Sequence, residues 1–216
     1  MCSPYHARRD IVSSNCRVEK NVYLCENIQH RIMRPIFLVG FMGSGKTTLG
    51  RTLSAKMNLQ FIDLDIFIEN RFCRSVKQIF AERGEEAFRK IERNMLLEVC
   101  DFEDTIVACG GGTPCHFDNM EVMNEHGVSV FLNATPEIIF NRLTIPSAKA
   151  KRPLVASKTD DELREFIASS LAARAKFYGK ATIEFNSSNL EDRTQIAEST
   201  NALAALITDY LASHQM

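Results

Sequence analysis

The sequence predicts an α/β protein built on a doubly wound parallel sheet. Two observations point to this class: short apolar runs alternate with longer helical patterns along the chain, and a glycine-rich loop directly follows the first strong apolar run. Strands that alternate with helices are typical of parallel sheets. The chain has 216 residues, of which 45% are hydrophobic, enough for one domain with a good core or for two small ones.

The individual elements follow from local pattern. The first strand is expected at Ile36–Val39, an apolar run that ends at a glycine, and a helix follows at 46–57. Thr135 and Pro136 are typical of the N-cap and the first position of a helix. The polar stretch 144–159 interrupts this alternation of strands and helices. Further strands are expected at 60–63, 105–109, 128–133 and 182–185, and further helices at 65–72, 75–83, 85–100, 117–126, 160–176 and 191–213.

Residues 1–32 differ from the rest of the chain. They are polar throughout, show no periodic apolar face, and lack an apolar segment of the length found in signal peptides. Met33 stands just before the first strand. We therefore expect a single domain over 33–216, with 1–32 a tag, a linker or the product of a start set too far upstream; a genuine flexible extension is the alternative.

Charge and cysteine content exclude several classes of protein. The formal net charge is −1, so no global basic field indicates nucleic acid or a membrane surface as a partner. No apolar run approaches the roughly 20 residues that a membrane span requires. The seven cysteines form no C-x-x-C pair and are odd in number, which favours reduced thiols and a cytoplasmic location over disulfides or a zinc site.

The strongest motif is the loop Gly40–Thr47, which reads GFMGSGKT and matches G-x-x-x-x-G-K-[ST] in full. A strand precedes it and a helix follows, the context in which backbone N–H groups and the helix N-terminus hold phosphates. Lys46 is expected to reach the β- and γ-phosphates and the Thr47 hydroxyl to bind Mg²⁺. The motif predicts nucleotide binding but does not say what the nucleotide is used for.

Two carboxylates follow the second predicted strand. Asp63 and Asp65 lie two positions apart, so both would share one face of an extended segment at the carboxyl edge of the sheet, where ligands bind in such folds. Asp63 is placed to hold Mg²⁺ through water and Asp65 to face an acceptor hydroxyl. The alternative for Asp65 is that it caps the following helix.

Basic and glycine residues complete a second polar pocket. Arg89, on a predicted helix, and Arg174, on a later one, are candidates to clamp an anionic acceptor with their planar guanidinium groups. Gly110–Gly112 follows a strand and allows a ligand to approach the backbone. The run Lys149–Arg152 suits a lid over phosphates. The alternatives are arginines and a basic loop that are merely solvated.

The absence of an Asn-Lys-x-Asp guanine reader argues against a GTPase switch. A second polar pocket argues for an enzyme with an acceptor substrate rather than a protein that only binds a nucleotide.

From about Met33 to its C-terminus, the chain resembles shikimate kinase, a small member of the P-loop kinases related to nucleoside monophosphate kinases. The resemblance implies a five-stranded parallel sheet of order 2-3-1-4-5 and a lid at about 144–159. The motifs that carry it, in the family's order, are GFMGSGKTT, DLD, GEEAFR, GGG, RPL and ARAKFY. The combination is far more specific than the loop alone.

The resemblance implies a role for each matched residue of the nucleotide site. Thr47 ligates Mg²⁺, Asp63 contacts it through water, and Arg152 reaches from the lid to the ATP phosphates. The phosphates are wrapped by Gly43, Ser44, Gly45, Lys46, Thr47 and Thr48. The chain departs from the family in the lid, where an expected second arginine is missing, and in 186–193, where no adenine contact can be assigned.

For the acceptor, the resemblance implies that Asp65 binds the hydroxyls and acts as base, with Lys46 and Arg152 also catalytic. Arg89, Arg174 and the Gly111 backbone hold the carboxylate. The implied reaction is ATP-dependent phosphorylation of the 3-hydroxyl of shikimate in chorismate and aromatic amino-acid synthesis, with Mg²⁺ and a monomeric enzyme. The alternatives are a kinase for another small polyol acid such as gluconate, and a catalytically silent nucleotide-binding protein.

Overall fold

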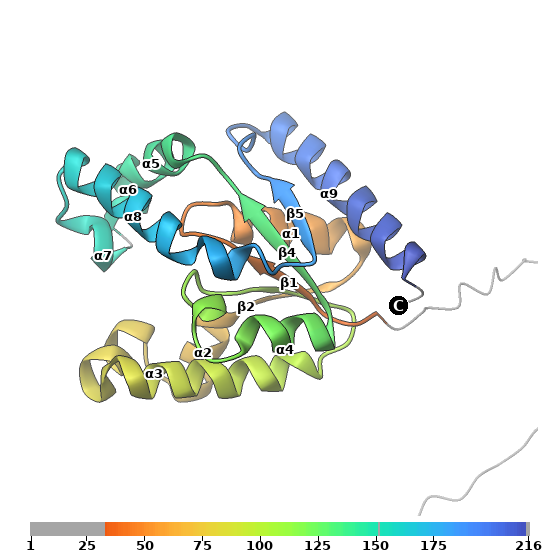
Figure 1. Ribbon diagram of the computed structural model, residues 1–216, viewed down its shortest axis with the longest axis horizontal. Helices are drawn as coiled ribbons and strands as arrows, with labels where there is room; N and C mark the ends of the chain where they lie inside the picture. Colours follow the sequence, from red (N-terminus) through yellow and green to blue (C-terminus); the bar gives the residue numbers. More distant parts are fainter. Residues whose placement is uncertain (1–32, 151, 215–216) are drawn as a thin grey trace, which may run out of the picture. The chain divides into compact units, whose positions relative to one another are not determined.

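The computed structural model describes residues 33–150 and 152–214, so the expectation for 1–32 lies outside the described residues. Figure 1 shows the arrangement of its elements. The strands are β1 (Ile36–Val39), β2 (Gln60–Asp63), β3 (Thr105–Ala108), β4 (Val128–Asn133) and β5 (Ile183–Asn186). The helices are α1 (Lys46–Met57), α2 (Leu64–Phe72), α3 (Val76–Cys100), the 3-10 turn η1 (Thr113–Cys115), α4 (Asn119–His126), α5 (Pro136–Thr144), α6 (Pro146–Ala150), α7 (Pro153–Ala156), α8 (Asp160–Tyr178) and α9 (Arg193–Ser213).

The five strands form one sheet of order β2-β3-β1-β4-β5, which confirms the expected fold class and strand order. All four neighbouring pairs are parallel, with Ile36 of β1 opposite Ile106 of β3 on one side and Val128 of β4 on the other. Parallel strands end at the same edge, so the loops after β1, β2 and β3 meet there. The candidate residues Asp63 and Gly110–Gly112, and the glycine-rich loop, lie at that edge.

Each face of the sheet is covered by its own hydrophobic core. Alternate residues of a strand point to opposite faces, and Phe37 and Val39 of β1 pack toward α2, α3 and α4. Ile36 and Leu38 pack on the other face against α1 and α9. In Figure 1, α9 accordingly lies across the sheet from α3 and α4. A third cluster joins α5 to α8 through residues that include Leu143 and Leu163.

Several expected boundaries differ from the structure. The helices predicted on either side of Gly84 form one run, α3, with Gly84 at φ 77° and ψ 173°, so the predicted interruption is present as a kink. The helix expected from 117 starts at Asn119, after η1. The interrupting stretch 144–159 contains two short helices, because Pro146 and Pro153 each suit a first helical position.

The cap assignment for Asp65 is wrong, and so is its placement on extended backbone. Asp63 occupies the N-cap position of α2, and Asp65 lies in the first helical turn. The Thr135 N-cap is confirmed, since its side chain accepts a hydrogen bond from the Ile138 N–H.

Among the described residues, no helix is long and apolar enough to span a membrane.

Candidate active site

The loop between β1 and α1 has the backbone that phosphate binding requires. Gly43 and Gly45 have φ values of 82° and 96°, in the left-handed region that favours glycine, and α1 begins immediately afterwards at Lys46. Ser44 is buried, and its hydroxyl has no hydrogen-bond partner within the described residues. The loop therefore directs the N-terminus of α1 and a buried hydroxyl toward the carboxyl edge of the sheet, as a phosphate cradle does.

Lys46 is held inside this loop. Its ammonium Nζ donates hydrogen bonds to the carbonyl oxygens of Gly40 and Phe41, both at 2.8 Å. Burial lowers the pKa of Lys46 to about 8, while the negative charges of Asp65 and Asp63 oppose this shift. The lysine charge is thus poorly solvated and lies close to both carboxylates.

Thr47 and Asp63 supply oxygen atoms from two adjacent loops. The Thr47 hydroxyl donates to Oδ2 of Asp63 at 3.2 Å. A hydroxyl and a carboxylate are the hard oxygen ligands that Mg²⁺ prefers, and Mg²⁺ commonly takes only one or two protein carboxylates, with water and phosphate completing its shell. The pair fits such a site. No cluster of three or more His, Cys, Asp or Glu that could hold a metal occurs in the described residues.

Asp65 is a half-buried carboxylate with a raised proton affinity. Burial raises the pKa of Asp65 to about 6, and the neighbouring negative charges of Asp63 and Glu92 raise it further. Its Oδ1 lies 3.0 Å from the position that a Cβ on Gly110 would occupy. Asp65 therefore borders the glycine triplet, and a carboxylate with a raised pKa is a suitable proton acceptor.

Arg89 is fixed by two glutamates. Its guanidinium donates from Nη1 to Glu92 at 2.9 Å and from Nη2 to Glu85 at 3.1 Å, and it stands over the rings of Phe80 and Phe88 at 5.7 and 5.4 Å. Glu92 is almost fully buried, whereas the Glu85 side chain is 64% exposed. The buried partner orients the guanidinium, and the exposed one is the partner that an anionic ligand would replace.

Both candidate acceptor arginines reach the glycine triplet. A Cβ on Gly112 would lie 3.0 Å from Nη1 and Nη2 of Arg89, and one on Gly111 would lie 3.4 Å from Nη1 of Arg174. Arg174 also donates to the Gly111 carbonyl at 3.1 Å and stands over the Phe41 ring at 5.4 Å. The structure thus gathers Asp65, Arg89, Gly111 and Arg174, which the sequence places far apart, around one short loop.

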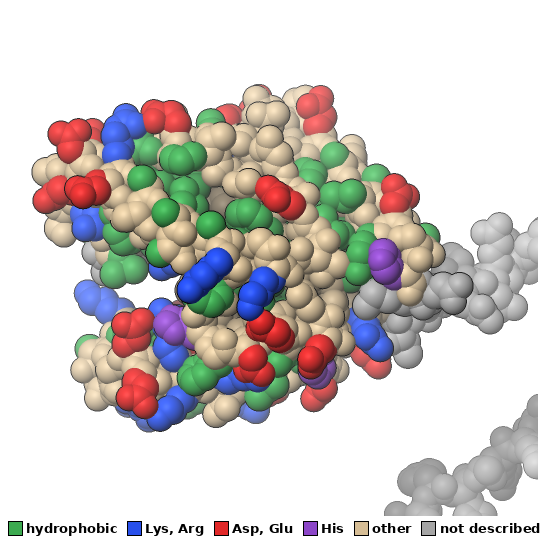
Figure 2. All heavy atoms as spheres, in the orientation of Figure 1, with side chains coloured by type: hydrophobic (Ala, Val, Ile, Leu, Met, Phe, Trp, Pro, Cys, Tyr) green, Lys and Arg blue, Asp and Glu red, His purple; other side chains and the backbone are tan. Residues whose placement is uncertain are grey.

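Arg152, the arginine predicted to lie in a lid, is within electrostatic range of the phosphate loop. Arg152 is half-buried at the N-cap of α7, where burial lowers its pKa, and its positive charge contributes to lowering the pKa of Lys46. The ammonium group of Lys149 instead donates a hydrogen bond to the Lys158 carbonyl at 2.8 Å. Lys151 lies outside the described residues. Figure 2 shows Lys and Arg side chains gathered on the left of the molecule, between α8 and α3.

Sequence reasoning missed two residues that support the site. Glu92 is 1% exposed and binds both Arg89 and the Thr113 hydroxyl, which lies just after the glycine triplet. Its spacing of three residues from Arg89 on a helix was the available signal. Arg142 donates to the carbonyls of Gly43, at 3.2 Å, and of Ser187 and Ser188, so it ties the phosphate loop to the segment after β5. No sequence pattern marks that arginine.

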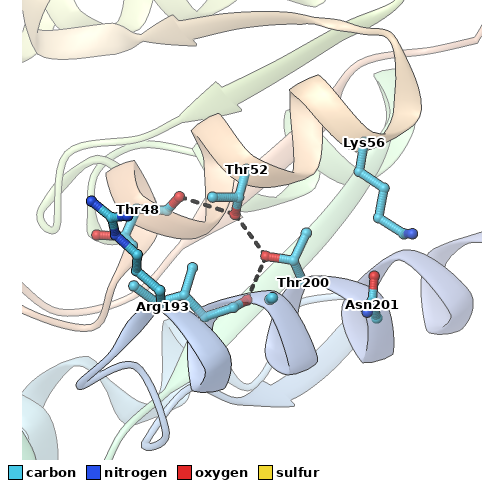
Figure 3. A pocket seen from close by; sticks show the side chains of 8 residues that line it. Thr48, Thr52, Lys56, Arg193, Thr200 and Asn201 are labelled. Carbon is cyan, nitrogen blue, oxygen red and sulfur yellow. Dashed lines mark hydrogen bonds between the residues drawn. The ribbon is translucent and has the colours of Figure 1, made fainter.

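A cavity of about 480 Å³ lies beside this site, between α1 and α9 (Figure 3). At its wall the hydroxyl groups of Thr52 and Thr200 are hydrogen-bonded to each other at 2.7 Å. Its lining residues are Thr48, Thr52, Lys56, Arg193, Ile196, Ala197, Thr200 and Asn201. Only Thr48 belongs to the predicted nucleotide site, so the cavity adjoins that site rather than forming it.

The sheet order, the phosphate loop after β1 and the charged cluster at the same edge define a P-loop fold of the small-molecule kinase type. Comparison with known proteins narrows this class. The family model for shikimate kinase matches residues 42–204. A shikimate kinase from Phocaeicola vulgatus is 53% identical over 171 residues, which are 79% of this chain and 97% of that protein.

Solved structures of shikimate kinases are also similar to this chain. A crystal structure of shikimate kinase from Bacteroides thetaiotaomicron has a TM-score of 0.79 at 50% identity and covers 82% of this chain and 99% of its own. Shikimate kinase from Acinetobacter baumannii, in complex with shikimate, has a TM-score of 0.69 at 26% identity, with 83% and 96% covered. This chain belongs to the shikimate kinase family.

The environment of Asp65 predicts how it titrates. Because burial and nearby carboxylates disfavour its charged form, its carboxyl should lose its proton with a midpoint near pH 6, about two units above an exposed aspartate. Asp63→Asn removes one of these charges and should lower the midpoint. Carbon-13 NMR titration of the ligand-free protein measures both values. A midpoint near 4 that Asp63→Asn leaves unchanged would contradict this environment.

Proposed function

We propose that this protein transfers the γ-phosphoryl group of ATP to the 3-hydroxyl of shikimate, giving shikimate 3-phosphate and ADP on the route to chorismate and the aromatic amino acids. Family membership supports the reaction class. The observation that carries the acceptor assignment is the convergence of Arg89 and Arg174 on Gly111 and Gly112, with Asp65 at the neighbouring glycine. Two guanidinium groups around a bare backbone loop suit a small carboxylate.

The nucleotide is assigned to the loop after β1. The residues proposed to wrap its phosphates are Gly43, Ser44, Gly45, Lys46, Thr47 and Thr48, with Arg152 added from the lid. Thr47 and Asp63 would hold Mg²⁺, Asp63 through water. When bound there, Mg²⁺ supplies positive charge to the β- and γ-phosphate oxygens.

The acceptor is assigned to the region around the glycine triplet, which Arg89 of α3 and Arg174 of α8 both reach. Its carboxylate would replace exposed Glu85 at Arg89 and bind Arg174, while Glu92 keeps Arg89 oriented. Within the described residues, the amide N–H of Gly111 and that of Gly112 make no hydrogen bond, so both can donate to the same carboxylate. The ring hydroxyls then face Asp65.

The proposed reaction needs little covalent chemistry from the protein. Asp65 accepts the proton of the 3-hydroxyl as that oxygen bonds to the γ-phosphorus, and the bond from phosphorus to the β–γ bridging oxygen breaks to release ADP. Lys46 and Arg152 stabilise the charge on the transferring group, and the poor solvation of Lys46 makes its charge more effective there than it would be in water. Every residue used comes from one chain, which is the basis for proposing a monomer.

An ADP-release assay with shikimate, quinate and gluconate as acceptors tests the proposal. ADP should form with shikimate and far more slowly with the others. Lys46→Ala is the control for a silent binding protein: loss of a charge that acts on the transferring phosphate should reduce turnover by roughly 10²–10³-fold, by analogy with a lost oxyanion donor. Gluconate as the preferred acceptor, or no turnover at all, would support one of the two alternatives.

The carboxylate assignment predicts the effect of removing either arginine. Arg89→Leu and Arg174→Leu should each raise the KM for shikimate about tenfold to a hundredfold, because a charge-assisted hydrogen bond contributes ~1.5–3 kcal/mol. The KM for ATP should change little. Lys90→Leu, beside Arg89 but paired with exposed Glu86, is the matched control.

Because Arg89→Leu leaves buried Glu92 without its ion pair, the melting temperature of each variant is measured alongside its kinetics. An analogue of shikimate that lacks the carboxylate should react poorly with the wild type. Neither arginine substitution should lower the rate with this analogue much further. An analogue that reacts as well as shikimate would remove the basis for both arginine assignments.

The lid assignment predicts protection by substrate. If Arg152 meets ATP when residues 144–159 close, their backbone amides should exchange hydrogen more slowly with both substrates bound than in the free protein. Amides of α9 outside its first turn serve as the internal control and should change little. Equal exchange at 144–159 in the two states would count against a lid.

A further inference from the structure

Tyr178 connects the end of α8 to the glycine triplet. The residue is 1% exposed, and its hydroxyl donates to the Gly111 carbonyl at 2.7 Å. Its ring is stacked on Phe131 of β4, with ring centroids 5.0 Å apart and an interplanar angle of 17°. Packing against the sheet therefore fixes the ring, and the fixed ring holds the hydroxyl against one peptide of the loop.

Within the described residues, few other contacts hold the Gly111 peptide in place. Gly110–Gly112 has no side chains that could pack, and its neighbouring carbonyls are used in local turns, by Thr113 N–H on Gly110 and Cys115 N–H on Gly112. Among the described residues, the carbonyl of Gly111 accepts hydrogen bonds only from two residues of α8, from the Tyr178 hydroxyl and from Arg174. In a planar trans peptide the C=O and the next N–H point in opposite directions, so fixing this carbonyl also aims the Gly112 N–H.

The two donors on Gly111 are not equivalent. Arg174 bonds at 3.1 Å and is also a candidate carboxylate ligand, and a guanidinium forms stronger hydrogen bonds to a carboxylate than to a neutral carbonyl. A bound carboxylate therefore competes with Gly111 for Arg174. The Tyr178 hydroxyl also interacts with Arg174, but its ring is held by stacking on Phe131, so its bond to Gly111 can persist when the arginine turns to the ligand.

We propose that Tyr178 is a positioning residue of the acceptor site: its hydroxyl holds the Gly111 peptide in place, so that the loop amides stay aimed at the acceptor carboxylate while Arg174 binds it. This inference rests on the proposed function, which assigns Gly111 and Arg174 to the carboxylate. Burial raises the pKa of Tyr178 to about 12, so the hydroxyl remains a donor throughout the neutral range.

Tyr178→Phe tests the inference because it removes one hydroxyl and keeps the stacked ring. We expect the KM for shikimate to rise roughly threefold to tenfold, the range that corresponds to one neutral hydrogen bond. The kcat and the KM for ATP should stay within about twofold. Tyr210→Phe is the matched control, since Tyr210 lies on α9 and no hydrogen bond of its hydroxyl occurs within the described residues.

The acceptor analogue without a carboxylate separates positioning from a general structural effect. Tyr178→Phe should leave its kcat/KM nearly unchanged, because it offers nothing for the loop amides to bind. An unchanged KM for shikimate would overturn the inference, and so would an equal loss for shikimate, the analogue and ATP. Failure of the wild type to phosphorylate shikimate would instead refute the proposed function, so the two failures are distinguishable.

Discussion

The site depends on the parallel pairing of β1 with β3. That pairing, continued by the bond from the Cys109 N–H to the Leu38 carbonyl at 3.0 Å, brings the loops after both strands to one edge. A Cβ on Gly111 would lie 3.4 Å from the Gly40 carbonyl oxygen, so the glycine triplet directly borders the phosphate loop. A donor site and an acceptor site in contact are what transfer between two bound molecules requires.

The same pairing explains why the charges at this edge behave unusually. Lys46 and Asp65 are partly buried at this edge, and the burial lowers the pKa of Lys46 and raises that of Asp65. Both groups remain close to their titration range at neutral pH, and charge on each stabilises charge on the other. A partly buried site of this kind makes each fixed charge more effective on a phosphoryl group in transfer than it would be in water.

Local patterns predicted the strands, the phosphate loop and most of the helices, because apolar periodicity, glycines and caps act over a few residues. Local pattern predicted the helix at 65–72 but not that Asp63 is its N-cap, so that Asp65 lies in the first turn and not on extended backbone. Asp65, Arg89 and Arg174 were candidates for an acceptor pocket from local reasoning, and the family resemblance assigned both arginines to one carboxylate. Glu92, Arg142 and the contact between Tyr178 and Gly111 escaped prediction, since the last spans 67 residues and depends on how α8 packs. The two short helices within 144–159 were not predicted, because that stretch is polar in composition.

We propose that one site binds the shikimate carboxylate and directs the 3-hydroxyl to Asp65. A crystal structure of the protein with shikimate and ADP measures this directly. We expect the carboxylate between the guanidinium groups of Arg89 and Arg174, within hydrogen-bond distance of a Gly111 or Gly112 amide, and the 3-hydroxyl hydrogen-bonded to the Asp65 carboxylate. Shikimate bound with its carboxylate away from both arginines, or with a different hydroxyl at Asp65, would contradict it.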